Sequence, residues 1–283
     1  MRTESKSSSK VMGPRGAGLI RSLYEADLQT FSVADAIRLS GVSEKAVRDA
    51  LNRLLRAGVI ARVKPGLYNI VPFELGNESD FLGSAPKIAV EIARRALPEG
   101  ASFFLSHGTA MTMHQLVTQP LLTVYLTTPK QLRPVSTMGT EIKFISTKAE
   151  KCFGIENHWI DKSTAVPISD LERTVLDGLK QPNYCGGLIE VAKGFWMKRG
   201  ELDLKKLVAY TKRIGVGAVA SRLAYLLHLY QLGEPEILNQ LREEFTSNYS
   251  LLDPDMPAEG RHDSRWQLRL NVTEEEFRST IRT

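Results

Sequence analysis

Residues 18–70 hold the feature that most restricts the fold of this chain, a run of helical and strand periodicities in a fixed order. We predict a first helix over residues 18–27, a short extended stretch over 30–32 and a second helix over 33–39. Ser32 is in a position to cap the second helix. The apolar stripe of the first helix consists of Leu19, Ile20, Leu23 and Tyr24.

A third helix follows the turn that Gly41 supplies. Ser43 is the expected N-cap, and the helix is predicted to end near Ala57. Two helices joined by a short turn with a glycine form a helix-turn-helix. The apolar side of the third helix consists of Val47, Ala50, Leu51, Leu54 and Leu55, at helical spacing.

A hairpin is predicted directly behind the third helix. Its strands cover residues 59–63 and 67–70, and Lys64, Pro65 and Gly66 form the turn between them. A hairpin with a basic tip in this place is the wing of a winged helix. The sequence therefore predicts a winged helix-turn-helix domain over residues 15–75, preceded by a disordered tail over residues 1–14.

The net charge of the chain is concentrated in this first quarter. Residues 1–75 contain 12 Lys and Arg against 7 Asp and Glu, which accounts for the whole net charge of +5. The other 208 residues contain 25 basic and 25 acidic residues. Such an asymmetry indicates a module that binds a polyanion, joined to a neutral body.

The polar side of the third helix is suited to reading DNA. Lys45, Arg48 and Asn52 share this side at helical spacing. Arginine bonds guanine and asparagine bonds adenine in the major groove, each through two hydrogen bonds. A hydroxyl, an ammonium and free backbone N–H groups near a helix N-terminus can hold a phosphate. The DNA-binding residues that we predict are Ser43, Lys45, Arg48, Asn52, Arg53, Arg56, Arg62 and Lys64.

A plainer interpretation of the same residues is a solvated basic helix. A winged helix that is structural, or that binds protein, is therefore the alternative. The charge lies, however, on the expected helix, before the expected hairpin and in the only basic region of the chain. We therefore favour double-stranded DNA as the ligand.

The rest of the chain is predicted to be a separate unit of helices and strands. Residues 76–84 are the expected linker and residues 85–283 the C-terminal domain. The predicted elements are helices over 87–97 and 107–116, strands over 103–106, 122–127, 141–146 and 165–168, helices over 169–180, 184–198, 203–213 and 216–231, a hairpin of 250–254 with 265–271, and a helix near 273–281. The fold class is therefore α+β: a winged helix-turn-helix followed by a larger mixed α/β domain with a helical C-terminal part.

Composition excludes several classes of protein. With 283 residues, 42% hydrophobic and 24% charged, the chain is an ordinary globular protein of about two domains. No apolar stretch is long enough to span a membrane, and the N-terminus lacks the apolar core of a signal peptide. Two distant cysteines, Cys152 and Cys185, do not form a disulfide framework. A cytoplasmic location without membrane contact is therefore expected.

Candidate catalytic groups in the body do not form a recognisable set. His107 and His114 are seven residues apart, which does not suit a zinc helix, so we expect capping or core roles. Cys185 lacks an identifiable histidine base. Asp170 and Asp177 would share one side of a helix, without Glu172. We therefore predict no catalytic residues, no cofactor and no metal.

The order of motifs in the body resembles the AbiEi family, the antitoxins of bacterial type IV toxin–antitoxin systems. The resemblance extends over roughly residues 15–272. The runs that carry it are 105–110 (LSHGTA), 124–130 (VYLTTPK), 153–156 (FGIE), 166–177 (VPISDLERTVLD), 182–187 (PNYCGG), 219–227 (VASRLAYLL) and 252–254 (LDP).

The resemblance implies a two-domain antitoxin, and because the residues form no catalytic set we expect that the chain is not an enzyme. In that family the winged helix binds inverted repeats upstream of its own operon and represses it. The C-terminal domain neutralises a nucleotidyltransferase-like toxin encoded beside it, without a stable complex. We accordingly expect a monomer that associates cooperatively on its promoter.

This chain departs from the family in one respect. The C-terminal domain of the family is often basic on one surface, whereas this body is neutral. Basic residues that would still cluster on helical faces are Lys205, Lys206, Lys212, Arg213 and Arg222.

Two other classes of function remain as alternatives. One is a winged-helix regulator whose C-terminal domain senses a small ligand. The other is an enzyme fused to a winged helix, which the lack of a nucleophile–base pair or a metal set disfavours. An adjacent gene for a nucleotidyltransferase-like protein would favour the antitoxin.

Overall fold

The computed structural model describes residues 12–71, 85–119, 121–137, 139–162 and 164–279. The predicted linker over 76–84 and most of the predicted tail, residues 1–11, lie outside these ranges. The chain divides into two compact units. The first consists of Met1–Glu91 with Pro134–Ile142, and the second of Ile92–Arg133 with Lys143–Thr283. The first unit is therefore not confined to the residues expected for the winged helix.

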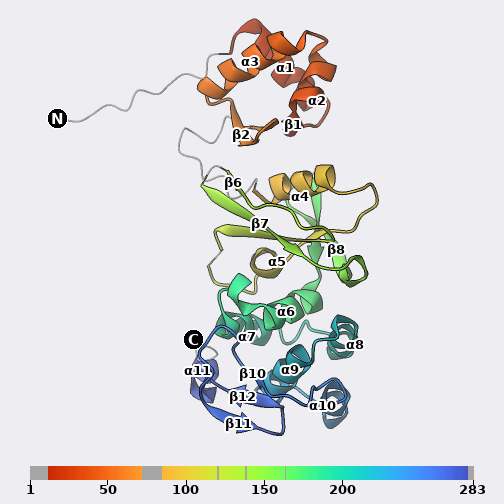
Figure 1. Ribbon diagram of the computed structural model, residues 1–283, viewed down its shortest axis with the longest axis vertical. Coiled ribbons are helices and arrows are strands. Elements are labelled where there is room, and N and C mark those ends of the chain that lie inside the picture. Colours follow the sequence, from red (N-terminus) through yellow and green to blue (C-terminus); the bar gives the residue numbers. More distant parts are fainter. Residues whose placement is uncertain (1–11, 72–84, 120, 138, 163, 280–283) are drawn as a thin grey trace, which may run out of the picture. The chain divides into compact units, whose positions relative to one another are not determined.

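Three helices and three short strands form the winged helix (Figure 1). They follow the predicted order closely, and the αL conformation of Gly41, with φ of 65°, makes the turn between the second and third helices. The elements are α1 (Pro14–Glu25), β1 (Thr30–Ser32), α2 (Val33–Ser40), α3 (Glu44–Arg56), β2 (Ile60–Lys64) and β3 (Leu67–Ile70).

Local chemistry explains where these helices begin. The Ser32 hydroxyl accepts from the Asp35 N–H at 3.1 Å, and an Asp35 carboxylate oxygen accepts from the Ser32 N–H at 2.9 Å, which makes a capping box. Helix α1 begins at Pro14, four residues before the predicted start, because proline is favoured in the first turn. Tyr24, predicted on the buried stripe of α1, is instead 48% exposed.

The wing is the outer hairpin of a three-stranded sheet in the order β1-β3-β2. Strand β3 pairs antiparallel with both neighbours, and the register of β2 shifts between Arg62 and Lys64. The core beneath the sheet consists of Leu19, Ile20, Leu23, Phe31, Ala36, Val47, Leu51, Leu54, Val59, Ile60, Tyr68 and Ile70.

A six-stranded sheet has the order β6-β7-β5-β4-β9-β8. Strand β4 pairs antiparallel with β5 and parallel with β9, and β8 forms a hairpin with β9 at one edge. The elements here are α4 (Ala85–Ala96), β4 (Phe104–Leu105), α5 (His107–Met113), β5 (Thr123–Thr128), β6 (Val135–Thr137), β7 (Thr140–Ser146), β8 (Ile155–Trp159) and β9 (Ala165–Ser169).

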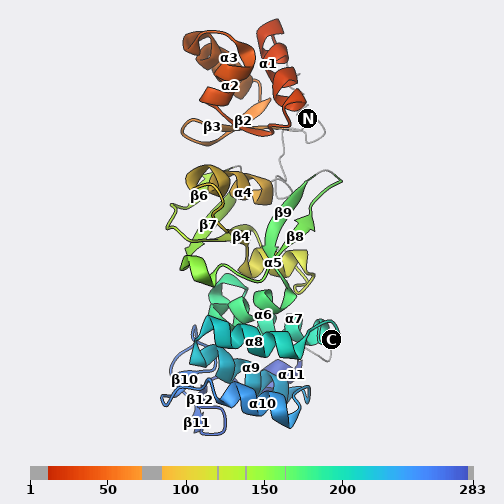
Figure 2. The same ribbon diagram turned by 90° about the vertical axis from the view of Figure 1, so that its right-hand side faces the viewer.

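The remainder is mainly helical, with a small three-stranded sheet (Figures 1 and 2). Helix α6 packs against α7, α8 and α9, and α10 packs against α8 and α9. The elements are α6 (Leu171–Lys180), α7 (Leu188–Met197), α8 (Leu204–Ile214), α9 (Gly217–Leu229), α10 (Pro235–Arg242), β10 (Ser250–Leu251), β11 (Arg261–Asp263), β12 (Leu268–Leu270) and α11 (Glu274–Ser279).

Sequence patterns missed four strands and helices and one pairing. Strands β6, β8 and β11 and helix α10 were not predicted, since β6, β11 and α10 are short and β8 is mostly exposed. The predicted hairpin of residues 250–254 with 265–271 is wrong. Strand β10 runs parallel to β12, and β11 forms the antiparallel pair with β12. The fold class is confirmed as α+β, with a winged helix before a larger mixed domain.

Candidate nucleic-acid interface

Helix α3 turns an apolar side inward and a polar side to solvent. Val47, Leu51 and Leu54 are buried in the core of the winged helix. Ser43 caps the helix as predicted, its hydroxyl accepting from the Ala46 N–H at 3.4 Å. The polar residues predicted on the other side, Ser43, Lys45, Arg48, Asn52, Arg53 and Arg56, are all exposed.

These exposed side chains differ in how they are already bonded. Arg48 donates from Nε and Nη2 to Glu44 Oε1, at 2.9 and 2.6 Å. Arg53 Nε donates to the carbonyl oxygen of Asp49 at 3.2 Å. Among the described residues, the side chains of Lys45, Asn52 and Arg56 have no hydrogen bond or ion pair with the protein, and so are available to a ligand.

The wing carries the other two predicted residues. Arg62 is exposed, and its carbonyl oxygen accepts from Thr137 Oγ1 of β6 at 3.4 Å within the first unit. Lys64 is half-buried beside the turn, where Gly66 takes a φ of 78°. The register of β2 with β3 shifts between Arg62 and Lys64, so the regular alternation of side chains between the two faces of the sheet is interrupted here.

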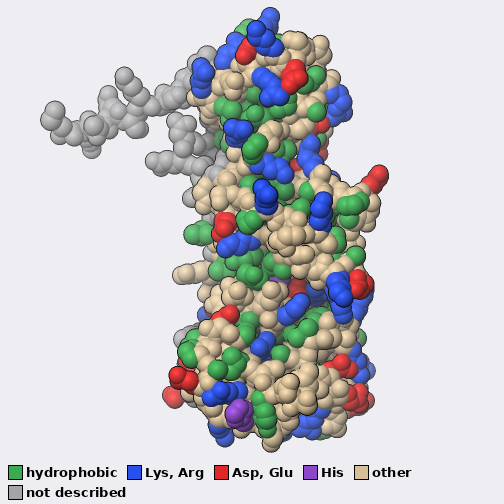
Figure 3. Space-filling model, in the orientation of Figure 1, with side chains coloured by type: hydrophobic (Ala, Val, Ile, Leu, Met, Phe, Trp, Pro, Cys, Tyr) green, Lys and Arg blue, Asp and Glu red, His purple; other side chains and the backbone are tan. Residues whose placement is uncertain are grey.

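Arg15 is a basic residue at this surface that sequence reasoning missed. It is exposed in the first turn of α1 and lines a hollow of about 320 Å³ together with Arg53 of α3. Pro14 was the available signal, because proline marks the first turn of a helix. In the view of Figure 3, the charged side chains that can be seen over α1–α3 are mainly Lys and Arg.

Of the five basic residues of the body that were predicted to cluster on helical faces, four are engaged by other groups of the protein, and Lys205 is exposed. Lys206 Nζ bonds Glu172 at 2.7 Å and Asp170 at 3.2 Å. Lys212 pairs with Glu243 at 3.3 Å, and the Arg213 guanidinium lies 3.9 Å from the centre of the Phe153 ring. Arg222 is buried and donates to the carbonyl oxygens of Leu179, Leu251 and Leu252.

The acidic residues of α6 are arranged differently from our prediction. Asp170 is the N-cap of α6, accepting from the Arg173 N–H at 2.9 Å, and it lies with Glu172 around Lys206. Asp177 pairs instead with Arg173, at 2.9 Å. Burial alone would lower the pKa of Lys206, but hydrogen bonds to Glu172 and Asp170 raise it. Within the described parts of the chain, no group of His, Cys, Asp and Glu is placed to hold a metal ion.

The three candidate catalytic residues His107, His114 and Cys185 occupy structural positions. His107 is buried, with Nδ1 2.9 Å from Ser106 Oγ and Nε2 3.3 Å from Gln181 Oε1. His114 Nε2 lies 2.7 Å from the carbonyl oxygen of Ser169. Burial lowers the pKa of His107, and burial next to Asp177 raises the pKa of the Cys185 thiol. A raised pKa disfavours the thiolate that a nucleophile needs.

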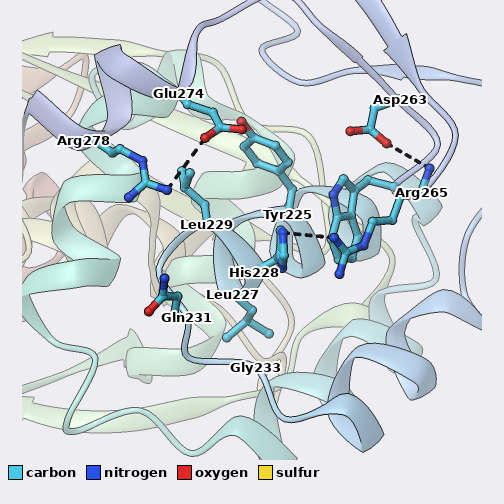
Figure 4. Close-up of a pocket in the computed structure, with 11 residues that line it drawn as sticks. Tyr225, Leu227, His228, Leu229, Gln231, Gly233, Asp263, Arg265, Glu274 and Arg278 are labelled. Carbon is cyan, nitrogen blue, oxygen red and sulfur yellow. Dashed lines mark hydrogen bonds and ion pairs between the residues drawn. The ribbon is translucent and has the colours of Figure 1, made fainter.

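A separate pocket of about 370 Å³ lies in the helical part of the body (Figure 4). His228 Nε2 and Arg265 Nη1 are 3.1 Å apart, and the Arg278–Glu274 ion pair measures 3.7 Å. Tyr225 also lines it, and its hydroxyl is buried without a hydrogen-bond partner in the described structure. Burial raises the pKa of this hydroxyl.

None of the helices in the described ranges combines the length and the apolar character needed to cross a membrane.

Comparison with known proteins supports the winged helix and the overall fold. Residues 21–71 match a family described as a transcriptional regulator, AbiEi antitoxin. The RV2827C protein from Mycobacterium tuberculosis has a similar crystal structure, with a TM-score of 0.71 over 98% of both chains and 13% sequence identity. No curated protein matches the sequence. The family match confirms the resemblance over residues 21–71, whereas the motifs between residues 105 and 254 lie outside it.

Proposed function

Since residues 21–71 match the AbiEi family of transcriptional regulators and antitoxins, we propose that this chain represses its own operon. The winged helix binds double-stranded DNA at inverted repeats in the promoter. Helix α3 enters the major groove, where Arg48 and Asn52 contact bases. Ser43, Lys45, Arg53, Arg56, Arg62, Lys64 and Arg15 contact the phosphate backbone.

The observation that carries this proposal is the free polar side of α3. Lys45, Asn52 and Arg56 are exposed and have no partner among the described side chains, on a helix whose other side is fixed in the core. A helix anchored in this way presents its polar side chains without a conformational rearrangement, which limits the ordering cost of binding. The adjacent wing adds further basic groups at Arg62 and Lys64.

Fluorescence anisotropy with the upstream region of its own gene tests the proposal. We expect the full chain to bind this duplex more tightly than a scrambled duplex of the same length and composition. The Lys45→Ala/Asn52→Ala variant should lose that preference, whereas Arg261→Ala, an exposed change on β11, should keep it. Equal binding of both duplexes by the unchanged protein would refute sequence-specific repression.

We further propose that the C-terminal domain neutralises a nucleotidyltransferase-like toxin without forming a stable complex with it. The family match and the division of the chain into two compact units support this division of labour. Co-expression with the neighbouring gene should restore growth, and affinity purification should recover the chain without the toxin. Absence of such a neighbour, or of any rescue, would contradict the antitoxin function.

A regulator that senses a small ligand is the second candidate, and the pocket beside α9 favours it. Its charged rim of Arg265, Arg278 and Glu274 offers polar contacts to a ligand. A dialysable factor from cells that releases the protein from DNA, but fails to release Arg278→Ala, would support this function. Release of both proteins alike would exclude the pocket as its site.

A further inference from the structure

Strand β8 is an edge of the six-stranded sheet with an exposed apolar pair. It occupies the end of the order β6-β7-β5-β4-β9-β8, beyond β9 (Figure 2). Ile155 is 37% exposed and Trp159 is 66% exposed. Edge strands are normally protected against pairing with other strands, and large exposed apolar side chains provide no such protection.

The hydrogen-bonding direction of each residue in β8 follows from its register with β9. The Asp170 N–H donates to the Gly154 carbonyl oxygen at 2.9 Å, and the Ile160 N–H donates to that of Thr164 at 3.0 Å. Both bonds involve even-numbered residues of the β8 segment, and antiparallel ladders alternate. The N–H and C=O groups of the odd-numbered residues, Ile155, Asn157 and Trp159, therefore point away from β9 to the open edge.

The side chains of β8 are complementary to those of a second β8. In an antiparallel pair centred on Asn157, Ile155 lies opposite Trp159 of the other copy and Glu156 lies opposite His158. Apolar residues thus meet apolar ones, and an acid meets a base. In this pairing, residues 155, 157 and 159 form the hydrogen bonds between the two copies. These are the residues whose backbone N–H and C=O groups point away from β9.

We propose that β8 pairs with β8 of a second copy of this chain, antiparallel about Asn157, and so forms a two-fold symmetric dimer. The side-chain and backbone patterns both select this register, because a shift by one residue would oppose backbone groups already bonded to β9. The pairing does not depend on DNA binding. Its two-fold symmetry is, however, the symmetry of an inverted repeat.

A second copy suits this edge better than an arbitrary strand. Glu156 lies on the side of the sheet where its cross-strand neighbour is the buried Ile168. The Glu156 carboxylate disfavours pairing with a strand that places an uncharged or acidic residue opposite it. In a second copy of the chain, the residue opposite Glu156 is the basic His158. Five residues per strand bury little area, so the dimer is weak and exchanges rapidly.

Cysteine cross-linking measures the register directly. Residue 157 faces its own equivalent at a Cα separation of about 5.5 Å, which suits a disulfide. Residue 159 is about 14 Å from its equivalent, because the two are offset by four residues along neighbouring strands. In a Cys152→Ser background, mild oxidation should convert Asn157→Cys to a covalent dimer and leave the equally accessible Trp159→Cys monomeric. Equal or absent dimer in the two variants overturns the proposal.

Charge exchange provides a test without oxidation. Glu156→Lys places a lysine opposite His158, and His158→Glu places two carboxylates opposite each other, so each variant should self-associate about tenfold more weakly. In an equimolar mixture of the two variants, the introduced lysine faces the introduced glutamate and the remaining native pair is restored, so association should be regained in sedimentation experiments. Leu122→Ser, which removes another exposed apolar side chain, should have no effect.

The single charge variants and their mixture together decide whether β8 pairs with β8 of a second copy. Weaker self-association of both single variants with recovery in the mixture supports β8 pairing. A mixture no better associated than its components overturns it, even if a dimer forms elsewhere. Association only with a strand of another protein, and none between copies, also overturns it.

Discussion

The ion pair of Arg48 with Glu44 determines how readily this guanidinium can reach a base. Both side chains are 59% exposed, and an exposed pair of this kind contributes only about 0.2–1 kcal/mol. A bidentate contact with guanine is worth about 1–3 kcal/mol of discrimination. The internal pair therefore holds Arg48 in place without preventing the exchange of Glu44 for a base.

Substitution of Arg48 separates base reading from backbone contact. We expect Arg48→Ala to lose about 1–3 kcal/mol of binding to the operator and little on scrambled DNA. Glu44→Ala should bind both duplexes slightly more tightly, because it removes a competitor and a negative charge. Competition anisotropy at fixed salt measures these differences, and equal losses on both duplexes would make Arg48 a phosphate contact.

His107 connects buried polar groups on three elements. The Thr127 hydroxyl donates to Ser106 Oγ at 2.8 Å, so the Ser106 hydroxyl is free to donate to Nδ1 of the ring. We therefore assign the N–H to Nε2, which faces Gln181 Oε1. This arrangement gives both ring nitrogens of the neutral imidazole a hydrogen-bond partner.

Stability should consequently decrease in acid. Because burial lowers the pKa of His107, the unfolded chain binds more protons than the folded chain below about pH 6.5. The free energy of unfolding should fall with decreasing pH by up to about 1.4 kcal/mol per pH unit from this group. Urea unfolding at pH 7.0 and 5.5 measures the fall.

Two histidine variants test whether His107 causes this loss of stability in acid. His107→Asn should reduce the loss, and asparagine tolerates the φ of 51° at this position. His262→Asn, at an exposed histidine, should retain it. An unchanged loss in His107→Asn would mean that other groups cause the acid sensitivity.

Among the elements of the winged helix, α3 and the wing offer different kinds of contact to DNA. The polar side of α3 combines groups that bond bases with groups that bond phosphates, whereas the wing offers only cations at Arg62 and Lys64. Phosphate contacts release counterions and make binding depend on salt, without regard to sequence. The wing should therefore contribute to affinity more than to specificity.

Salt dependence measures the contribution of the wing. Lys64→Ala should lower the slope of log K against log salt by about one, equally for operator and scrambled DNA. Lys64→Arg keeps the charge and should keep the slope. If Lys64→Ala leaves the slope unchanged, the wing does not contact the DNA backbone.

Across the chain as a whole, the proposed functions belong to different units. The exposed polar side of α3 lies in the first unit, and most of the body forms the second. In the body, Lys206, Lys212, Arg213 and Arg222 are engaged by Glu172, Glu243, Phe153 and backbone carbonyl groups, in that order. Repression and protection from a toxin should therefore be separable without truncating the chain.

A full-length variant tests this separation. Lys45→Ala/Arg48→Ala/Asn52→Ala should lose repression of a reporter under its own promoter, because the exposed side of α3 is removed and its core side is kept. The same protein should still restore growth when co-expressed with the neighbouring toxin gene. Loss of both activities at normal protein levels would mean that protection acts through DNA.

The winged helix could be predicted from the sequence because its signals are local. The Ser32 and Ser43 caps, the turn at Gly41 and the apolar spacing of α3 each depend on residues only a few positions apart. The same locality predicts the exposed polar side of α3, since a helix with one apolar side must turn the other to solvent. The family match over residues 21–71 is consistent with this.

In the body, by contrast, long-range packing determines which residues are buried and which strands are neighbours. Arg222 looks like a surface cation in the sequence, yet carbonyl groups from residues 179, 251 and 252 enclose it. Strand β10 pairs parallel with β12, and β8 lies at an edge because its hairpin partner β9 pairs with β4, about 60 residues earlier in the chain. Such contacts depend on the packing of the whole body, and they cannot be predicted from a periodicity that extends over only a few residues.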